Sequence, residues 1–305
     1  MASTDRVALV ALFRSTGGAG WRRTDNWETD AAITTWHGVE VNDQGRVVKL
    51  YLGANNLQGN IPPKLGDLQQ LQELWLSDNH LTGPIPKELG ALSKLEQLTL
   101  WANDLTGTIP PELGKLTALH TLYLARNQLS GSIPPELGDL KELKVLRLSS
   151  NELTGLIPPE LGKLGAIQHL ALSGNNLSGP IPKELGDLSE LEGLSLSYNK
   201  LTGTIPPELG NLTALQMLYL PQNGLSALWD HTQDAHGVGN GEGANGKSGG
   251  AVPRHLSRLL DVLDRCGGLH LYGNPWTEPP ESIVIKGATG IRGYFEDLYA
   301  EPCRI

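Results

Sequence analysis

The chain repeats one pattern of hydrophobic and polar positions every 24 residues between residues 47 and 225. In residues 71–94 the pattern runs Leu71, Leu74, Leu76, Asn79, Leu81, Gly83, Ile85, Pro86, Leu89, Gly90, Leu92. The asparagine recurs without a slip at Asn55, Asn79, Asn103, Asn127, Asn151, Asn175, Asn199 and Asn223. A fixed period of this length predicts supersecondary units that stack into a solenoid.

Each unit contains a short segment with alternating hydrophobic positions. Leu74 and Leu76 are two residues apart, so both face one side of an extended chain while Trp75 faces the other. This spacing predicts one short parallel strand per repeat. Gly83 and Pro86 mark the return path of the chain. Ile85 and Leu89 close the unit from the convex side. Because only stacking can bury these side chains, the leucines are structural and function is expected on outward-facing positions.

The second half of the unit, LxGxIPxxLGxL, resembles the plant-type subclass of leucine-rich repeats. The resemblance implies an α/β solenoid, a right-handed horseshoe with one strand per repeat and helical caps at both ends. An asparagine at the turn can bond backbone groups that would otherwise be buried without a partner. The resemblance further implies that the recurring asparagines form a structural ladder.

The segments outside the array predict two caps and an insertion. Residues 1–46 form an N-terminal cap, in which hydrophobic residues at helical spacing precede three tryptophans that we expect to close the apolar end of the solenoid. Residues 47–225 are the regular repeats. Residues 226–252 are rich in glycine and lack periodicity, which predicts a flexible insertion. Residues 253–305 are the last repeat and the C-terminal cap.

Residues 269–298, LHLYGNPWTEPPESIVIKGATGIRGYFEDL, look like the junction that ends the leucine-rich repeats of Roco-family proteins. In that family a Ras-like GTPase domain follows the junction. This chain stops at Ile305 without such a domain. The resemblance therefore implies either a stand-alone relative or a longer form that carries the GTPase domain.

Charge and cysteine content limit which compartments and which classes of partner fit the chain. The formal net charge is -9 and the pI about 5.4, which argues against a nucleic-acid partner. No apolar run is long enough to span a membrane, and residues 7–13 are interpreted as a helix rather than a secretion signal. The N-terminal cap lacks the cysteine that secreted relatives typically place near Val41. Its absence, with only Cys266 and Cys303 in the chain, predicts a reducing, cytoplasmic location.

One motif could indicate catalysis. Residues 241–248 fit the phosphate-binding pattern G-x-x-x-x-G-K-[ST] through Gly241, Gly246, Lys247 and Ser248. Neither flank fits a strand or a helix, as the motif requires, so we interpret the match as chance in a glycine-rich loop. The histidines are scattered and lack metal-ligand spacing. The sequence therefore predicts no enzyme, no cofactor and no metal.

Outward-facing strand positions predict where a partner binds. The first half of the array exposes aromatic and basic side chains, namely Tyr51, Trp75, Trp101, Tyr123, Arg126 and Arg147. Tryptophan, tyrosine and arginine dominate the energetics of protein interfaces. The alternative is that the rings only stack on each other across adjacent strands. The positions from Ala171 to Ser197 are small and predict a smooth, featureless stretch.

The leading hypothesis is a non-enzymatic scaffold that recognises a protein partner of unknown identity on its concave face, in intracellular signalling. The first alternative is the sensor or regulatory arm of a Roco-like GTP-binding protein. The second alternative is a secreted receptor ectodomain or inhibitor, which the missing cap cysteines and the missing secretion signal disfavour.

Overall fold

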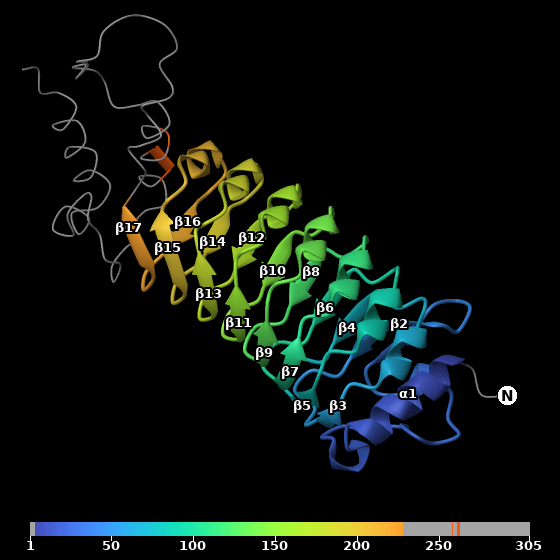
Figure 1. Cartoon of the computed structure of the whole chain (residues 1–305). Helices are drawn as coiled ribbons and strands as arrows, with labels where there is room; N and C mark the ends of the chain where they lie inside the picture. The colour runs from blue at the N-terminus through green and yellow to red at the C-terminus, as the bar shows by residue number, and fades with distance from the viewer. Residues whose placement is uncertain (1–3, 228–257, 259–260, 263–305) are drawn as a thin grey trace, which may run out of the picture.

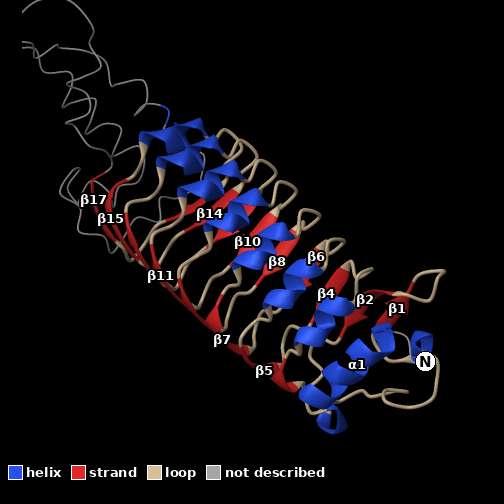
Figure 2. Ribbon diagram, turned by 45° about the vertical axis from the view of Figure 1, so that its right-hand side comes forward, coloured by secondary structure: helices blue, strands red, loops and turns tan. Residues whose placement is uncertain are grey.

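The computed structural model describes residues 4–227, 258 and 261–262. Its repeats stack into one elongated solenoid, which runs from the N-terminal helix to strand β17 (Figure 1). Two parallel sheets and a row of 3-10 helices enclose the core (Figure 2). The leucines and isoleucines of the repeats fill this core and are almost completely buried.

The first sheet takes one strand from each repeat, directly where Leu-x-Leu alternation predicts it. In order its strands are β1 (Val39–Val41), β2 (Val47–Tyr51), β4 (Glu73–Trp75), β6 (Gln97–Thr99), β8 (Thr121–Tyr123), β10 (Val145–Arg147), β12 (His169–Ala171), β14 (Gly193–Ser195) and β16 (Met217–Tyr219). Strand β1 pairs with β2 antiparallel, and the others are parallel. Equivalent residues of successive repeats are in register, as in the pair Leu146 and Leu170.

A second sheet, which the sequence analysis did not predict, lies on another side of the solenoid. It contains β3 (Gln58–Asn60), β5 (His80–Gly83), β7 (Asp104–Thr108), β9 (Gln128–Gly131), β11 (Glu152–Gly155), β13 (Asn176–Gly179), β15 (Lys200–Thr204) and β17 (Gly224–Ala227). Its register is staggered, so Thr82 pairs with Asp104 rather than with its repeat equivalent Thr106. These strands form because neighbouring repeats supply the hydrogen bonds, although the glycine that each of them contains disfavours a strand.

A 3-10 helix follows each strand of the second sheet from β3 to β15. These helices are η3 (Pro63–Asp67), η4 (Lys87–Ala91), η5 (Pro111–Lys115), η6 (Pro135–Asp139), η7 (Pro159–Lys163), η8 (Lys183–Asp187) and η9 (Pro207–Asn211). A proline occupies the position before each of them and fixes the backbone entry angle. The repeats approach closely here: a Cβ added to Gly138 would lie 2.2 Å from the carbonyl oxygen of Glu160 in the next repeat.

The recurring asparagines lie at the turn after each strand of the first sheet and are mostly buried. Asn127 is typical: its amide donates to the carbonyls of Leu100 and Leu124 at 3.0 and 3.1 Å, and its Oδ1 accepts from the Leu105 N–H at 3.0 Å. Asn55, at the start of the row, instead bonds the backbone of Arg23 in the cap. Each asparagine therefore ties a repeat to its predecessor.

The N-terminal cap consists of helix α1 (Thr4–Ser15), η1 (Gly18–Gly20), η2 (Ile33–Thr35) and the loops between them. Trp21, Trp27 and Trp36 are each less than 10% exposed. Trp27 contacts Trp21 and Trp36 with ring centroids 4.8 and 5.0 Å apart. The three rings close the apolar end of the core.

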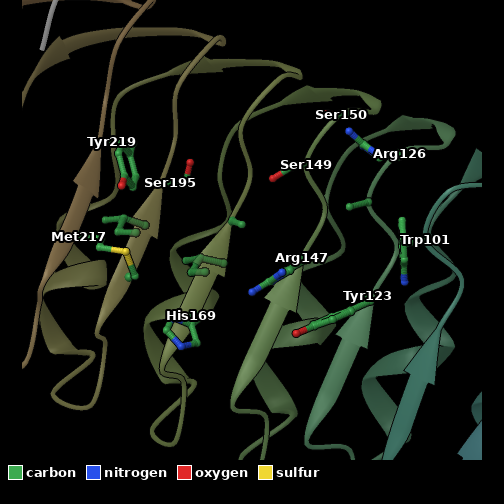
Figure 3. Close-up of a pocket in the computed structure, with 15 residues that line it drawn as sticks. Trp101, Tyr123, Arg126, Arg147, Ser149, Ser150, His169, Ser195, Met217 and Tyr219 are labelled. Carbon is green, nitrogen blue, oxygen red and sulfur yellow. The ribbon is translucent and has the colours of Figure 1, made fainter. Parts of the chain in front are cut away.

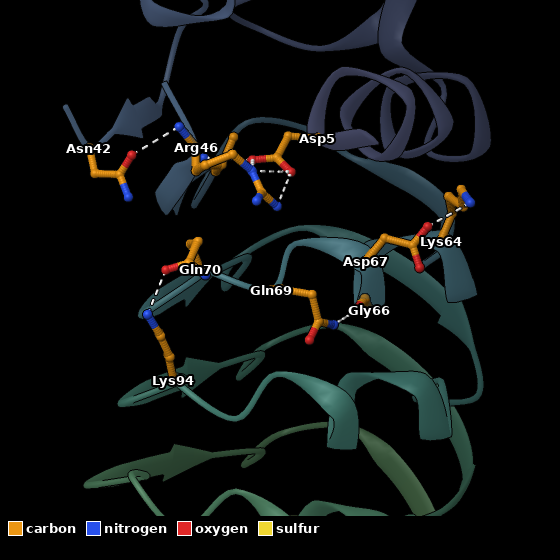
Figure 4. A network of polar contacts seen from close by, with 10 residues as sticks. Asp5, Asn42, Arg46, Lys64, Gly66, Asp67, Gln69, Gln70 and Lys94 are labelled. Atoms are coloured by element: carbon orange, nitrogen blue, oxygen red, sulfur yellow. Dashed lines mark hydrogen bonds and ion pairs between the residues drawn. The ribbon is translucent and has the colours of Figure 1, made fainter. Parts of the chain in front are cut away.

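An ion pair between the buried Asp5 and the half-buried Arg46 connects helix α1 to the start of the first repeat strand (Figure 4). Asp5 is fully buried and accepts hydrogen bonds from the Arg46 guanidinium at 2.8–3.1 Å and from the Val47 N–H at 2.8 Å. The cap is therefore held by aromatic packing and a charge-assisted network, and needs no disulfide.

The remaining predictions about the C-terminal part fall outside the described residues. They concern the glycine-rich insertion at 226–252 beyond residue 227, the C-terminal cap within 253–305, the Roco-like stretch at 269–298, and Cys266 and Cys303.

Candidate functional site

A hollow of about 520 Å³ lies on the face of the first sheet that points away from the leucine core (Figure 3). Its lining residues belong to strands β6 to β16 and the turns after them: Trp101, Tyr123, Ala125, Arg126, Arg147, Ser149, Ser150, His169, Leu170, Ala171, Gly193, Leu194, Ser195, Met217 and Tyr219. We call this set the hollow. Apart from Leu170 and Leu194, which belong to the core, its strand residues occupy the positions that alternation directs away from the leucine core.

The hollow arises from side-chain size along one face. Large side chains stand at one end, where Trp101, Tyr123 and Arg147 come from consecutive repeats, and Tyr219 stands at the other (Figure 3). Between them the equivalent strand positions carry only small residues such as Ala171. The stretch that the sequence analysis interpreted as smooth and featureless is therefore the floor of the hollow.

Gly193 lies on this floor, and two neighbouring side chains leave no room for a larger residue there. A Cβ added there would lie 3.0 Å from Nδ1 of His169 and 3.3 Å from the terminal methyl of Met217. These two side chains come from the strands on either side of Gly193. Any larger residue at this position would have to displace them, so glycine sets the depth of the floor.

The hollow carries positive charge and no acidic side chain among its lining residues. The Arg147 guanidinium lies over the Tyr123 ring, 4.9 Å from its centroid, which is a cation–π contact. Arg126 is exposed at a turn with a left-handed backbone, φ 56°. Within the described part of the chain, neither guanidinium forms an ion pair. The hollow is therefore locally basic in a chain of net charge -9.

Two of the six predicted partner-binding residues lie outside the hollow. The Tyr51 hydroxyl donates to Glu73 Oε2 at 2.7 Å, and Lys49 Nζ lies 3.1 Å from Glu73 Oε1. The Tyr51 ring also contacts Trp75, with centroids 4.9 Å apart. Hydrogen bonding to Glu73 raises the pKa of Lys49, and burial raises the pKa of Tyr51. Tyr51 and Trp75 thus contact each other across adjacent strands, while Trp75 remains 41% exposed.

The structure thus brings four of the predicted residues together in the hollow, namely Trp101, Tyr123, Arg126 and Arg147. It adds His169, Met217 and Tyr219, which the sequence analysis did not select. All three occupy outward-facing strand positions, and Met217 is 40% exposed. The available signal was the size of Met217 and Tyr219, which follow the run of small positions from Ala171 to Ser197, and of His169, which precedes it.

Other predicted features can be placed only in part. The phosphate-loop match at Gly241, Gly246, Lys247 and Ser248 lies outside the described residues. Among residues 4–227, 258 and 261–262, no cluster of three or more metal-ligating side chains is present. In the same residues, no helix has the length and hydropathy to cross a membrane.

A solenoid of stacked repeats with a hollow across several of them is the architecture of a repeat-type interaction scaffold. A leucine-rich repeat family model matches residues 117–177, and a second one matches residues 70–92, 94–116 and 190–212. A plant ice-binding protein is 32% identical with a TM-score of 0.62, and the match covers 73% of this chain and 80% of that one. The chain belongs to the leucine-rich repeat family.

Other solved structures that resemble the chain are plant receptors. The leucine-rich repeat ectodomain of the Arabidopsis thaliana membrane receptor kinase GASSHO1/SCHENGEN3, in complex with CASPARIAN STRIP INTEGRITY FACTOR 2, is 32% identical with a TM-score of 0.64. The match covers 89% of this chain and 33% of that one. The Arabidopsis receptor kinase HAESA, in complex with the peptide hormone IDA and the co-receptor SERK1, is 31% identical with a TM-score of 0.63.

The HAESA match covers 74% of this chain and 39% of that one, so the chain spans little more than a third of either receptor structure. A search of curated protein sequences finds no match.

These comparisons correct two expectations. The predicted cytoplasmic location is wrong, because the similar structures include the ectodomain of a membrane receptor kinase. The prediction failed because it interpreted the missing cap cysteine as a sign of a reducing compartment. Tryptophan packing and the pair of Asp5 with Arg46 hold this cap without a disulfide, so the cysteine carries no such information. The Roco-like GTPase arm finds no support in the comparisons.

Proposed function

We propose that the chain is a ligand-binding leucine-rich repeat module of the receptor-ectodomain type, and that it binds an extended peptide in the hollow. The observation that carries the proposal is the hollow itself, walled by aromatic and basic side chains and floored by small ones. The strands of the first sheet and the hydrogen-bonded turns after them hold these side chains, so the site is formed before a ligand arrives. The similarity to a receptor kinase structure that contains a peptide hormone supports the same class of ligand.

The dimensions of the hollow suit a short peptide. Its lining residues span β6 to β16, and neighbouring strands lie about 4.8 Å apart, which gives a length of about 24 Å. An extended chain advances about 3.3 Å per residue, so about seven residues cross the hollow along the solenoid axis. Large anchors such as Trp101 and Tyr219 at the two ends are the residue types that contribute most to binding.

The second sheet supports a binding role less well. It carries a row of exposed or half-buried hydroxyls, among them Thr82, Thr154 and Ser178, which prompts comparison with the similar ice-binding protein. In the staggered register, however, Thr82 pairs with Asp104 and Ser178 with Lys200. Charged side chains therefore interrupt the row, and we place the binding function on the first sheet.

The proposal can be tested by filling the floor of the hollow. A random heptapeptide display library is panned against the purified chain, and enriched peptides are synthesised and titrated. Ala171→Trp should weaken their binding at least tenfold, because an indole would occupy the space of the ligand. The fold should tolerate this change, since Trp75 occupies the equivalent position at the end of β4, four repeats earlier, and is 41% exposed there.

The matched control is Thr154→Trp, which places the same indole at an exposed position of β11 in the second sheet. Binding that is retained by Thr154→Trp and lost by Ala171→Trp supports the hollow as the site. Equal affinity in both variants would contradict it.

A further inference from the structure

We propose that Met217 is an oxidation site that controls binding in the hollow. Hydrogen peroxide converts its thioether to a sulfoxide, and the sulfoxide weakens the binding of a ligand. This inference rests on the proposed peptide-binding function and adds a means of regulation to the same site. Three features of the molecule lead to it: the exposure of the Met217 side chain, its place in the hollow, and the scarcity of methionine in the rest of the chain.

The Met217 side chain is open to solvent because its partner on the neighbouring strand has no side chain. Met217 is on β16, and its register partner on β14 is Gly193. The terminal methyl of Met217 reaches over this glycine, since a Cβ added to Gly193 would lie 3.3 Å from it. Figure 3 shows the side chain extending toward the strand that carries Ser195. Met217 is 40% exposed in this position, so a small neutral oxidant can reach it.

This exposed side chain belongs to the surface that a ligand in the hollow would cover. Met217 lines the hollow together with the floor residues Ala171, Gly193 and Leu194. A thioether is apolar and polarizable, and its flexible chain adapts to the shape of what it contacts. A ligand that covers Met217 removes apolar surface from water, which favours binding. The contribution of Met217 to binding therefore depends on its side chain remaining apolar.

Oxidation of methionine acts at a single position of the described chain. The sequence contains two methionines, and the other one, Met1, lies outside the described residues. The buried core of the described repeats is made of leucine, isoleucine and other residues without a thioether. Oxidation of Met217 therefore changes the surface of the hollow and leaves the packing between repeats as it is.

The reaction is a two-electron transfer of one oxygen atom. The Met217 sulfur attacks one oxygen of hydrogen peroxide, the O–O bond breaks and an S–O bond forms. The second oxygen leaves as water, so the peroxide is reduced and the sulfur is oxidised. The product is polar, and methionine sulfoxide reductases convert it back to the thioether. A ligand must remove water from the sulfoxide in order to contact it, which opposes binding unless the ligand supplies a hydrogen bond.

The first measurement is the rate at which hydrogen peroxide oxidises Met217 in the whole chain. The fragment that contains Met217 is followed by mass spectrometry in the folded chain, in the urea-unfolded chain, and in the folded chain saturated with a heptapeptide enriched from the library. The folded rate should lie within about fivefold of the unfolded rate, because the side chain is exposed. The bound heptapeptide should slow oxidation at least about fivefold, whereas a scrambled peptide that does not bind should have no effect. A folded rate below this range, or no protection by the bound peptide, would contradict the inference.

The second measurement is the affinity of the same peptides by titration calorimetry, before and after oxidation, for wild type and Met217→Leu. Leucine keeps the apolar character and approximate size of methionine and has no sulfur to oxidise. Oxidation should weaken binding to wild type about tenfold and change binding to Met217→Leu less than about twofold. Treatment with methionine sulfoxide reductases should restore the wild type. Met217→Gln, which places a polar side chain at the same position, should weaken binding without any oxidant.

The outcomes that overturn the inference differ in what they leave standing. Equal affinity of hollow-binding peptides for oxidised and reduced wild type would refute control by Met217 and leave peptide binding intact. An equal loss of affinity in oxidised Met217→Leu would assign the effect to another oxidised group, such as Cys266 or Cys303, and would refute the inference in the same way. Failure of the library to yield any peptide whose binding Ala171→Trp weakens would refute the proposed function itself, and the inference with it.

Discussion

The asparagine ladder makes a quantitative prediction about stability. Asn127→Ala removes an amide that is 9% exposed and that bonds backbone atoms of two repeats. The Leu105 N–H then loses its partner and stays buried. The Leu100 and Leu124 carbonyls each keep a hydrogen-bond donor, because Asn103 also donates to Leu100 at 3.1 Å and Asn151 to Leu124 at 3.0 Å.

The magnitude follows from this sharing. One buried N–H without a partner costs about 1–3 kcal/mol, and the loss of two hydrogen bonds to carbonyls that keep another partner costs about 0.5–1 kcal/mol each. Asn127→Ala should therefore lower the free energy of unfolding by about 2–5 kcal/mol. The double variant with Asn103→Ala should cost about 1–2 kcal/mol more than the sum of the single variants, because the Leu100 carbonyl then loses both donors.

Urea unfolding followed by circular dichroism measures these differences, with equal slopes as a check that the transitions are comparable. Gln128→Ala is the matched control, because the neighbouring Gln128 is exposed and makes only a long, exposed bond of 3.3 Å to Asp104. It should change the free energy of unfolding by less than about 0.5 kcal/mol. The reasoning fails if Asn127→Ala costs no more than this control, or if the double variant is additive.

Three further predictions concern the caps and the spacing of repeats. Asp5→Ala should lower the free energy of unfolding by about 2–4 kcal/mol in urea, since it removes the acceptor for Arg46; a loss below 1 kcal/mol would contradict the role of this pair. Gly138→Ala should lower the free energy of unfolding by about 1–3 kcal/mol, because the added Cβ would lie 2.2 Å from a carbonyl oxygen. Gly165→Ala has open space around the added Cβ and should be neutral or stabilising, so equal shifts of Tm in the two variants would refute this. Burial first, and then the charge of Arg23, lower the pKa of His37, so the folded state disfavours the protonated ring. Stability should therefore fall as pH drops below about 6.5, and Tm of His37→Gln should fall less over pH 7.5 to 5; parallel profiles would contradict this.

The sequence was sufficient to predict the solenoid, since a 24-residue period and the Leu-x-Leu pattern define the first sheet residue by residue. It did not predict the second sheet, because segments such as His80–Gly83 have weak strand preference and pair only through neighbouring repeats in a staggered register. The information for these strands lies in the stacking, which a single repeat does not show.

The candidate site was predictable in its side-chain types and not in its boundaries. Trp101 and Tyr123 were selected by size and exposure, and both line the hollow. Trp75 was selected by the same rule, but Tyr51 packs against it with centroids 4.9 Å apart. Conversely, Ala171 was set aside as small, although a hollow requires small residues between large ones. Such a shape depends on several repeats at once.

The most direct test of the central claim is the position at which a selected peptide crosslinks to the chain. A benzophenone residue is placed at either end of an enriched heptapeptide, and the crosslinked chain is digested and mapped by mass spectrometry. The account predicts crosslinks within residues 101–126 at one end of the hollow and within residues 217–219 at the other. Crosslinks confined to the second sheet, the 3-10 helices or the N-terminal cap would show that the hollow is not the binding site.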